Sequence, residues 1–175
     1  MALLPNLGLL LIDIQEKLFA KIREPDLLLS RLLLISKACQ ILEIPTIITQ
    51  QYPQGLGPTI EALPPAPTYD KTTFSCLGDA QIKAAIVNSG KTHWIVAGIE
   101  SHVCVLQTVR DLIANKMTPI VLQDAISSRN ILDHTSALQE MRTLGARVTT
   151  TETLLFELLE HSKHPHFKEI SRLIK

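Results

Sequence analysis

The sequence has no excess of charge of either sign and few aromatic side chains. Its 175 residues contain 17 lysines and arginines against 17 aspartates and glutamates, and only 4% of them are aromatic. Proteins that bind nucleic acids usually carry a basic surplus or stripe, and neither is present here. The composition therefore predicts that the protein has no nucleic-acid partner.

The sequence also lacks a disulfide framework, a targeting segment and a membrane-spanning run. Three cysteines are an odd number without framework spacing, which is typical of reduced intracellular proteins. The apolar segment 1–12 has no basic start and no small-residue cleavage site, and it is too short to cross a bilayer. We therefore expect a cytoplasmic protein with no membrane partner, and the length predicts a single domain over residues 1–175.

Short apolar runs alternate with longer segments of helical periodicity along the chain. This alternation predicts βαβ units and a three-layer α/β/α sandwich with a mainly parallel sheet of Rossmann-like topology. The expected strands are 7–14, 46–49, 93–97, 118–122 and 147–150, and the expected helices are 26–42, 80–89, 103–115, 133–144, 153–161 and 167–174. The proline-rich segment 50–77 is expected to be an irregular wall over a site at the carboxyl edge of the sheet.

Cys104 lies where the strand 93–97 ends in Gly98 and a helical pattern begins at Val103. A thiol at such a strand-to-helix turn is well placed for nucleophilic catalysis. The partial positive charge of a helix N-terminus favours thiolate over thiol. The alternative for Cys104 is a buried structural cysteine, as we expect for Cys39 and Cys76.

Two charged residues are expected to lie near this thiol. Asp13 ends the first strand, and Lys71 lies at the far end of the segment 50–77. A carboxylate, an ammonium and a thiol together suit acyl transfer, with Asp13 accepting the thiol proton, Lys71 holding the charges and Cys104 attacking a carbonyl. Taken alone, Asp13 could equally cap a helix and Lys71 could be a solvated loop residue.

Three segments resemble the isochorismatase-like cysteine hydrolases, which include nicotinamidases and N-carbamoylsarcosine amidases. The segments, in the order of that family, are Leu11–Gln15, Lys71–Ser75 and Ala97–Val105. The resemblance implies an Asp13–Lys71–Cys104 triad, a thioester intermediate and hydrolysis of a small amide or related C–N bond. It also implies a cis peptide at Ile99–Glu100 and an oxyanion hole formed by the backbone N–H groups of Glu100 and Cys104.

One segment departs from the nicotinamidase pattern. Nicotinamidases carry an Asp-x-His metal site after the second strand, whereas the segment Thr49–Gly57 here contains no carboxylate and no histidine. The sequence therefore predicts a metal-free branch of the family that needs no cofactor. The side chains proposed for the substrate pocket are Gln15, Phe19, Gln51, Tyr52 and Phe74.

Several alternatives remain open at this point. The protein could be a non-catalytic oligomeric scaffold or a thiol sensor that retains the hydrolase fold. A pair between Cys104 and His102 is disfavoured, because residues two apart on a helix point away from each other. His164 and His166 have a spacing that could touch a metal, but they lack a third ligand nearby. Asp124 is expected to tie down the loop 127–129.

The segment Leu27–Ile35 is apolar on more than one helical face. A fully buried helix or a subunit interface would explain this pattern. We therefore expect a homo-oligomer that acts on a small-molecule substrate.

Overall fold

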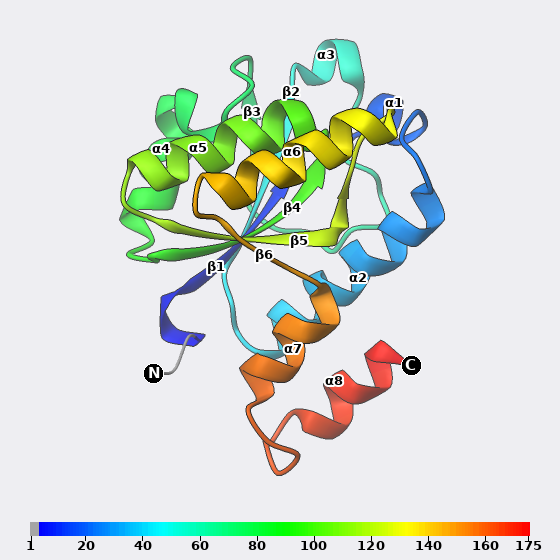
Figure 1. The fold of residues 1–175 in the computed structure, drawn as a ribbon, viewed down its shortest axis with the longest axis vertical. Coiled ribbons are helices and arrows are strands. Elements are labelled where there is room, and N and C mark those ends of the chain that lie inside the picture. The colour runs from blue at the N-terminus through cyan, green and yellow to red at the C-terminus, as the bar shows by residue number, and fades with distance from the viewer. Residues whose placement is uncertain (1–3) are drawn as a thin grey trace.

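Six parallel strands form one sheet in the computed structural model, which describes residues 4–175 (Figure 1). The strand order is β3-β2-β1-β4-β5-β6, and every neighbouring pair is parallel. The strands are β1 Leu7–Ile12, β2 Thr46–Gln51, β3 Thr68–Lys71, β4 His93–Ile99, β5 Thr118–Ser127 and β6 Arg147–Thr149. Because the chain order reverses between β1 and β4, the carboxyl ends of these two strands lie where open sheets of this kind bind ligands.

Helices cover both faces of the sheet. In Figure 1, α4, α5 and α6 lie on one face, and α2 and α7 lie on the other. The helices are α1 Glu16–Phe19, α2 Pro25–Ile41, α3 Pro53–Leu56, α4 Ala80–Asn88, α5 Leu106–Ala114, α6 Ile131–Thr143, α7 Thr151–Leu159 and α8 Phe167–Ile174. Short 3₁₀ turns span Leu4–Asn6 and Cys76–Gly78, and a π-helical turn spans Ser101–Val105. The predicted three-layer α/β fold is confirmed.

The first strand shows how the sequence builds a core on each face. Leu7, Leu9 and Leu11 pack with α2, α7 and α8, whereas Leu10 and Ile12 pack with α4, α5 and α6. All five side chains are buried, because alternate residues of a strand point to opposite faces and both faces are covered. This double burial explains why the strand is continuously apolar in sequence.

Local capping follows the expected chemistry. Asp79 accepts hydrogen bonds from the backbone N–H groups of the first turn of α4, and Asn130 does the same for α6. Gly145 follows the end of α6 with a φ of 91°, a conformation that glycine adopts without a Cβ penalty. These residues fix the helix boundaries to within two residues of the predicted ones.

The expectation of an irregular segment 50–77 is wrong in two places. Pro53–Leu56 forms α3, and Thr68–Lys71 forms β3, which pairs with β2 at the edge of the sheet. The fourth predicted strand is also longer than expected. It continues as β5 to Ser127, and its pairing register with β4 shifts between Val96 and Gly98.

Asp124 lies within this longer strand and does not tie down the loop 127–129. One of its carboxylate oxygens accepts hydrogen bonds from the backbone N–H and the hydroxyl of Thr151 at 2.8 and 3.0 Å. The other oxygen lies 3.6 Å from the Nε of Arg31. Asp124 therefore joins β5 to the start of α7 and to α2. The loop is held instead by Arg23, whose N–H donates to the carbonyl oxygen of Ser128 and whose carbonyl oxygen accepts from the hydroxyl of Ser127.

The apolar helix α2 is not fully buried. Leu28, Leu32 and Ile35 face the core, but the side chain of Leu27 is 51% exposed. Ile131 at the start of α6 is also half-exposed, and together with Leu27 it borders a surface hollow. The fully buried explanation is therefore wrong, and the subunit-interface explanation stays a prediction.

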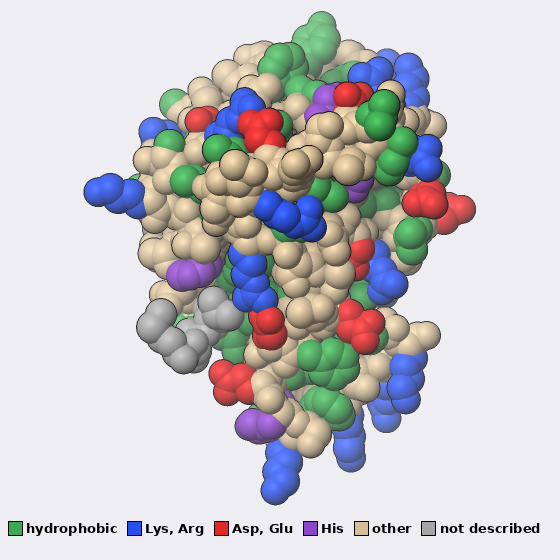
Figure 2. Space-filling view, in the orientation of Figure 1, with side chains coloured by type: hydrophobic (Ala, Val, Ile, Leu, Met, Phe, Trp, Pro, Cys, Tyr) green, Lys and Arg blue, Asp and Glu red, His purple; other side chains and the backbone are tan. Residues whose placement is uncertain are grey.

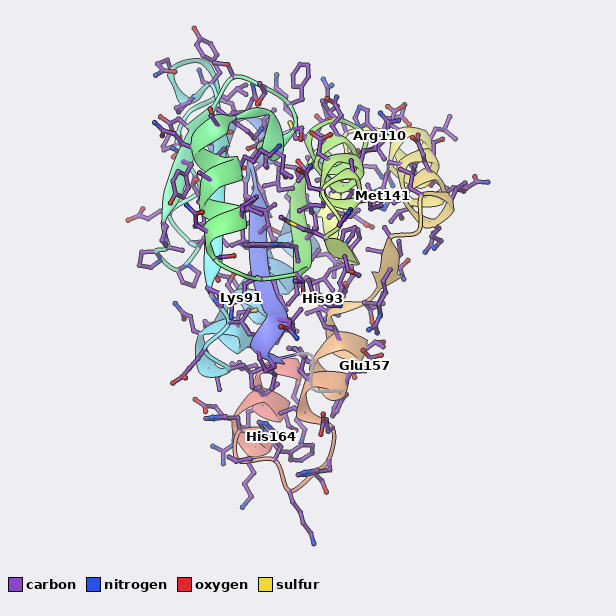
Figure 3. All side chains as sticks on the ribbon, turned by 90° about the vertical axis from the view of Figure 1, so that its left-hand side faces the viewer. Lys91, His93, Arg110, Met141, Glu157 and His164 are labelled. Atoms are coloured by element: carbon purple, nitrogen blue, oxygen red, sulfur yellow. The ribbon has the colours of Figure 1, made fainter. Side chains whose placement is uncertain are left out.

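The histidines near the C-terminus lie far from the carboxyl edge of the sheet. Figure 3 shows His164 beside α8, beyond the end of the sheet at which His93 begins β4. Within residues 4–175, no group of three or more His, Cys, Asp or Glu side chains is arranged to hold a metal ion. In the same range, no helix is both long enough and apolar enough to cross a membrane.

Candidate active site

Asp13 directly follows β1 and lies completely buried at the carboxyl edge of the sheet. Its backbone has a φ of 52°, so the chain turns sharply as it leaves the strand. The hydroxyl of Thr49 donates a hydrogen bond to Oδ1 at 2.7 Å, and the ammonium of Lys71 donates one to Oδ2 at 2.6 Å. Both carboxylate oxygens are thus occupied and held in a fixed orientation.

Lys71 ends β3 with its ammonium in the same buried cluster. Its Nζ lies 2.6 Å from Asp13 and 2.8 Å from the Oε1 of Gln51, and it also contacts the carbonyl oxygens of Thr73 and Phe74 at 3.2 and 3.0 Å. Burial on its own lowers the pKa of Lys71, but the Asp13 carboxylate together with Cys76 and Cys104 outweighs that effect, and the pKa is raised above its ordinary value. Lys71 therefore stays charged and neutralises Asp13.

Cys104 lies in the π-helical turn Ser101–Val105 with only 5% of its surface exposed. Burial raises the pKa of its thiol, the negative charge of Asp13 and a hydrogen bond to that carboxylate raise it further, and Lys71 opposes them. The prediction of a thiolate favoured by a helix N-terminus is therefore wrong. The α-helix itself begins only at Leu106, and burial and the Asp13 carboxylate both favour the thiol form of Cys104.

Gly98 makes the close packing of β1 and β4 feasible beside the site. It pairs with Ile12, the residue before Asp13, and has a φ of 129°. A Cβ atom at this position would lie 2.1 Å from the carbonyl oxygen of Ile12. Only glycine fits there. The following peptide bond, Ile99–Glu100, is cis.

The carbonyl oxygen of Glu100 holds the turn that contains Cys104. It accepts hydrogen bonds from the backbone N–H groups of Val103 and Val105 at 3.1 and 3.2 Å. Glu100 precedes the turn as its N-terminal cap in extended conformation. The residues on either side of Cys104 are therefore both hydrogen-bonded to Glu100.

A pocket with a cavity volume of about 160 Å³ opens over the thiol. Its lining comes from α1, the end of β2, α3, the segment after β3, the residue before the π-helical turn, that turn itself and the loop after β5. The residues are Leu18, Gln51, Leu56, Phe74, Glu100, Val103, Cys104 and Arg129. The pocket is therefore of a size for a small molecule, and most of its walls are apolar.

Comparisons with known proteins identify the family. The isochorismatase domain model matches residues 8–153. Isochorismatase domain-containing protein 2 of Danio rerio is 37% identical over 172 residues, which cover 95% of this chain and 85% of the relative. The chain belongs to the isochorismatase family.

Solved structures agree with this assignment. The MAR1 ribonuclease of Caenorhabditis elegans superposes with a TM-score of 0.90 at 37% identity, covering 97% of this chain and 89% of that one. The YcaC gene product of Escherichia coli, described as an octameric hydrolase of unknown specificity, superposes with a TM-score of 0.88 at 23% identity, covering 98% of this chain and 93% of that one. Its likeness supports the isochorismatase fold.

Five side chains of this isochorismatase-family chain are predicted to form the pocket. Two of them, Gln51 and Phe74, line it. Gln15 does not, because its amide braces the backbone: it donates to the carbonyl oxygens of Gln51 and Gly57 at 3.0 and 2.7 Å and accepts from the N–H of Gln51 at 2.7 Å. Phe19 packs against the core that contains α2, and Tyr52 borders a different surface hollow. The structure therefore places these three side chains outside the lining of this pocket.

Sequence reasoning missed the side chains of Leu18, Leu56, Val103 and Arg129 as pocket residues, and it assigned only a backbone role to Glu100. The position of Arg129 at the carboxyl end of β5 was an available signal, because loops at that edge surround the site. Leu18 and Leu56 lie on helices of four residues whose orientation no periodicity in the sequence defines.

Two further side chains near the site have other partners. The Nδ1 atom of His102 lies 3.0 Å from the hydroxyl of Ser128, so the imidazole is hydrogen-bonded to Ser128 and not to Cys104. Cys76 is completely buried, and burial raises the pKa of its thiol to about 11, with Asp13 adding to the rise and Lys71 opposing it. Cys76 also lies 3.7 Å from the hydroxyl of Thr49, and its packing role accords with the sequence expectation.

Proposed function

We propose that this protein is a cysteine hydrolase that cleaves a small amide or related C–N bond through a thioester on Cys104. The proposal rests on one observation above all: the buried ion pair of Asp13 and Lys71 lies beside a thiol at the base of a pocket. A buried ion pair is weak as a stabilising device, because desolvation of both charges offsets their attraction. A catalytic role accounts for its presence better than a structural one.

The reaction follows from the positions of the donors and acceptors. Cys104 Sγ attacks the substrate carbonyl while its proton passes to Asp13, and the tetrahedral intermediate collapses as Asp13 returns that proton to the leaving amine. A thioester and a free amine result. Water then attacks the thioester, Asp13 accepts its proton and returns it to the departing thiol, and a carboxylic acid leaves. Lys71 holds the Asp13 side chain in position between these transfers.

The backbone N–H groups of Glu100 and Cys104 are the proposed oxyanion hole. Backbone donors aimed at a developing oxyanion typically contribute a factor of about 10²–10³ each to the rate. They cost no reorganisation, because the turn that positions them is held by the carbonyl oxygen of Glu100. Neither a metal ion nor an organic cofactor enters the proposed steps.

The test combines turnover with trapping of the intermediate. A panel of small aliphatic and aromatic primary amides is incubated with the protein, ammonia release is measured, and acid-quenched samples are digested and analysed for acyl groups on the Cys104 peptide. Cys104→Ser should abolish both signals, and Asp13→Asn should lower turnover by about 10²–10⁴-fold. Cys39→Ala, which removes a buried thiol on the opposite face of the sheet, is the control and should retain activity.

The main alternative is a non-catalytic scaffold, or a thiol sensor in which Cys104 is oxidised. No ammonia release from any amide of the panel, together with a stable partner in pull-downs, would favour the scaffold. Reversible oxidation of Cys104 without turnover would favour the sensor. A ribonuclease activity is named for several solved relatives, so RNA hydrolysis belongs in the same panel. The zero net charge argues against it, and Figure 2 shows acidic and basic side chains interspersed on the face in view.

We further propose a homo-oligomer, because Leu27 and Ile131 leave apolar surface exposed beside one hollow. Light scattering coupled to size-exclusion chromatography tests this directly. A cytoplasmic location is also proposed, and three free buried thiols are consistent with a reducing compartment. The single-domain organisation of residues 1–175 can be tested by limited proteolysis.

A further inference from the structure

The turn that carries Cys104 depends on contacts from neighbouring elements. It is a π-helical turn, Ser101–Val105, and Glu100 before it makes no side-chain capping bond. Turns of this kind are rare in proteins and occur frequently at functional sites. The carbonyl oxygen of Ser101 accepts a hydrogen bond from the N–H of Leu106. Because this bond spans Cys104, a shift of Ser101 also moves the thiol.

The side chain of Ser101 joins this turn to α6. Ser101 is completely buried, and its hydroxyl lies 2.9 Å from Nδ1 of His134. α6 packs against the turn, and the backbone N–H of His134 donates to the carbonyl oxygen of Asn130 at 3.1 Å. The side chain of Asn130 caps the same end of the helix. A capped, regular helix therefore presents the imidazole to Ser101.

The protonation state of His134 suits a bond to a neutral hydroxyl. Burial lowers the pKa of the imidazole, and the positive charge of Arg23 lowers it further. The ring is therefore neutral at neutral pH. A neutral imidazole shares one hydrogen bond with a hydroxyl through Nδ1, so the bond to Ser101 does not depend on a change of protonation near pH 7.

Packing alone does not fix the turn on the side of His134. This imidazole borders a surface hollow of about 120 Å³, and side chains beside a hollow have fewer packing partners. The turn makes a second side-chain bond, from Nδ1 of His102 to the hydroxyl of Ser128 at 3.0 Å, but His102 is only half-buried. Because hydrogen bonds are directional and apolar contacts are not, the buried Ser101–His134 bond is the contact that defines the orientation of the turn.

We propose that His134 is a positioning residue that fixes the direction of the Cys104 side chain through the buried hydroxyl of Ser101. This inference rests on the proposed amide hydrolysis and goes beyond it, because His134 lies outside the lining of the pocket. Transfer of the thiol proton to Asp13 and attack on a carbonyl both need Sγ in a defined place. A displacement of about 1 Å can lower a rate by about 100-fold.

The first test is the alkylation of Cys104 by iodoacetamide at neutral pH, which needs no substrate. The thiolate displaces iodide, a thioether forms, and peptide mapping gives the rate. Burial and Asp13 raise the pKa of Cys104, so loss of the anchor should relieve both effects and speed the reaction. We expect His134→Leu and Ser101→Ala to react about fivefold faster than wild type, the equivalent of one net hydrogen bond. The double variant should react no faster than the faster single variant, because both changes remove the same bond.

Three comparisons separate positioning from a general loss of stability. Gln139→Gly weakens α6 at an exposed position further along the helix, and the rate at Cys104 should stay at the wild-type value. His134→Asn keeps a polar atom near the place of Nδ1 and should return the rate most of the way to wild type. Cys39, a buried thiol on the opposite face of the sheet, is mapped in every sample. General opening of the fold would raise its rate as well, whereas loss of the anchor should not.

The second test uses an amide that the wild-type protein hydrolyses. His134→Leu should lower kcat by about tenfold or more and leave KM within about twofold, since the pocket walls are intact and only the nucleophile is displaced. Gln139→Gly should change neither constant.

An unchanged or slower alkylation of Cys104 in either His134→Leu or Ser101→Ala overturns the proposal. An equal rise in Gln139→Gly or at Cys39 overturns it too, and so does a His134→Asn rate as high as that of His134→Leu. If one of the two main variants does not fold, as judged by circular dichroism, the other decides. Without amide turnover by the wild type, the hydrolase proposal fails and alkylation still decides the role of His134. Turnover with unchanged alkylation and kcat contradicts only the role of His134.

Discussion

Replacing Lys71 with methionine tests the buried ion pair most directly, because it removes one charge and leaves the other. Asp13 and Lys71 side chains are 0% exposed, and Nζ lies 2.6 Å from Oδ2. Removing one partner of such a pair leaves an uncompensated buried charge, which costs about 3–5 kcal/mol. The free energy of unfolding of a domain of this size is about 5–15 kcal/mol, so Lys71→Met should remain folded but lose a large part of this free energy.

The double variant Asp13→Asn/Lys71→Met separates the isolated charge from lost packing. With both charges removed, no buried charge remains and Thr49 can still bond to the side chain at position 13. We expect the double variant to regain at least half of the stability lost by Lys71→Met, so that the two single effects are strongly non-additive. Urea unfolding followed by circular dichroism measures all three free energies, and equal slopes show that the same surface is exposed in each.

An exposed ion pair provides the matched control. Arg110 and Glu140 pair on the surface with side chains 48% and 42% exposed, so Arg110→Met should cost less than about 1 kcal/mol. The reasoning fails if Lys71→Met costs as little as Arg110→Met. It fails equally if the double variant loses the sum of the two single losses, because the charges would then act independently.

Three further predictions concern the thiol, a glycine and a capping carboxylate. Burial and Asp13 raise the pKa of Cys104, so the rate of its alkylation by iodoacetamide should keep rising at pH values above about 8.5, where an exposed cysteine thiol ordinarily titrates. Asp13→Asn should shift this pH profile to lower pH. A wild-type profile centred below about 8.5 contradicts the raised pKa. Gly98→Ala should prevent stable folding, since its Cβ would lie 2.1 Å from a backbone oxygen. Gly90 has a φ of 69° and open space around it, so Gly90→Ala should lower the free energy of unfolding by only about 1–2 kcal/mol in thermal or urea unfolding. Similar losses of stability in the two variants would refute the steric argument. Asp124→Ala should destabilise the protein by about 1–3 kcal/mol in urea unfolding by leaving the N–H of Thr151 without its acceptor, and Asp133→Ala, at an exposed carboxylate, should cost less.

The fold was predictable because buried parallel strands have a strong signature in sequence. The continuous apolar run of β1 and the helix-ending role of Gly145 needed no tertiary information. The missed strand β3 has the sequence Thr-Tyr-Asp-Lys, which carries no such run, because only part of it is buried. It exists through its pairing with β2, and a pairing between segments some 20 residues apart is not visible in local propensity.

The electrostatics of Cys104 could not be predicted from its position in the sequence. A strand-to-helix turn indicates a nucleophile, but the sign of the pKa shift depends on burial and on the distance to Asp13, which only the folded chain defines. Similarly, Gln15 looks like a pocket residue because it follows Asp13 closely. Its amide is instead bonded to three backbone groups and is unavailable to a ligand.

The segment between β2 and β3 delivers Lys71 to Asp13, and the register of the two strands explains how. Gln51 is the register partner of Lys71, so the Gln51 side chain meets both the Lys71 ammonium and the carbonyl oxygen of Thr72. Gln15 in turn fixes the backbone of Gln51 from the side of β1. The position of Lys71 is thus set by strand pairing and two glutamine amides, and the connecting segment is itself tied to the end of β1 through the bond from Gln15 to the carbonyl oxygen of Gly57. For this reason the two glutamines serve the site even though only one of them lines the pocket.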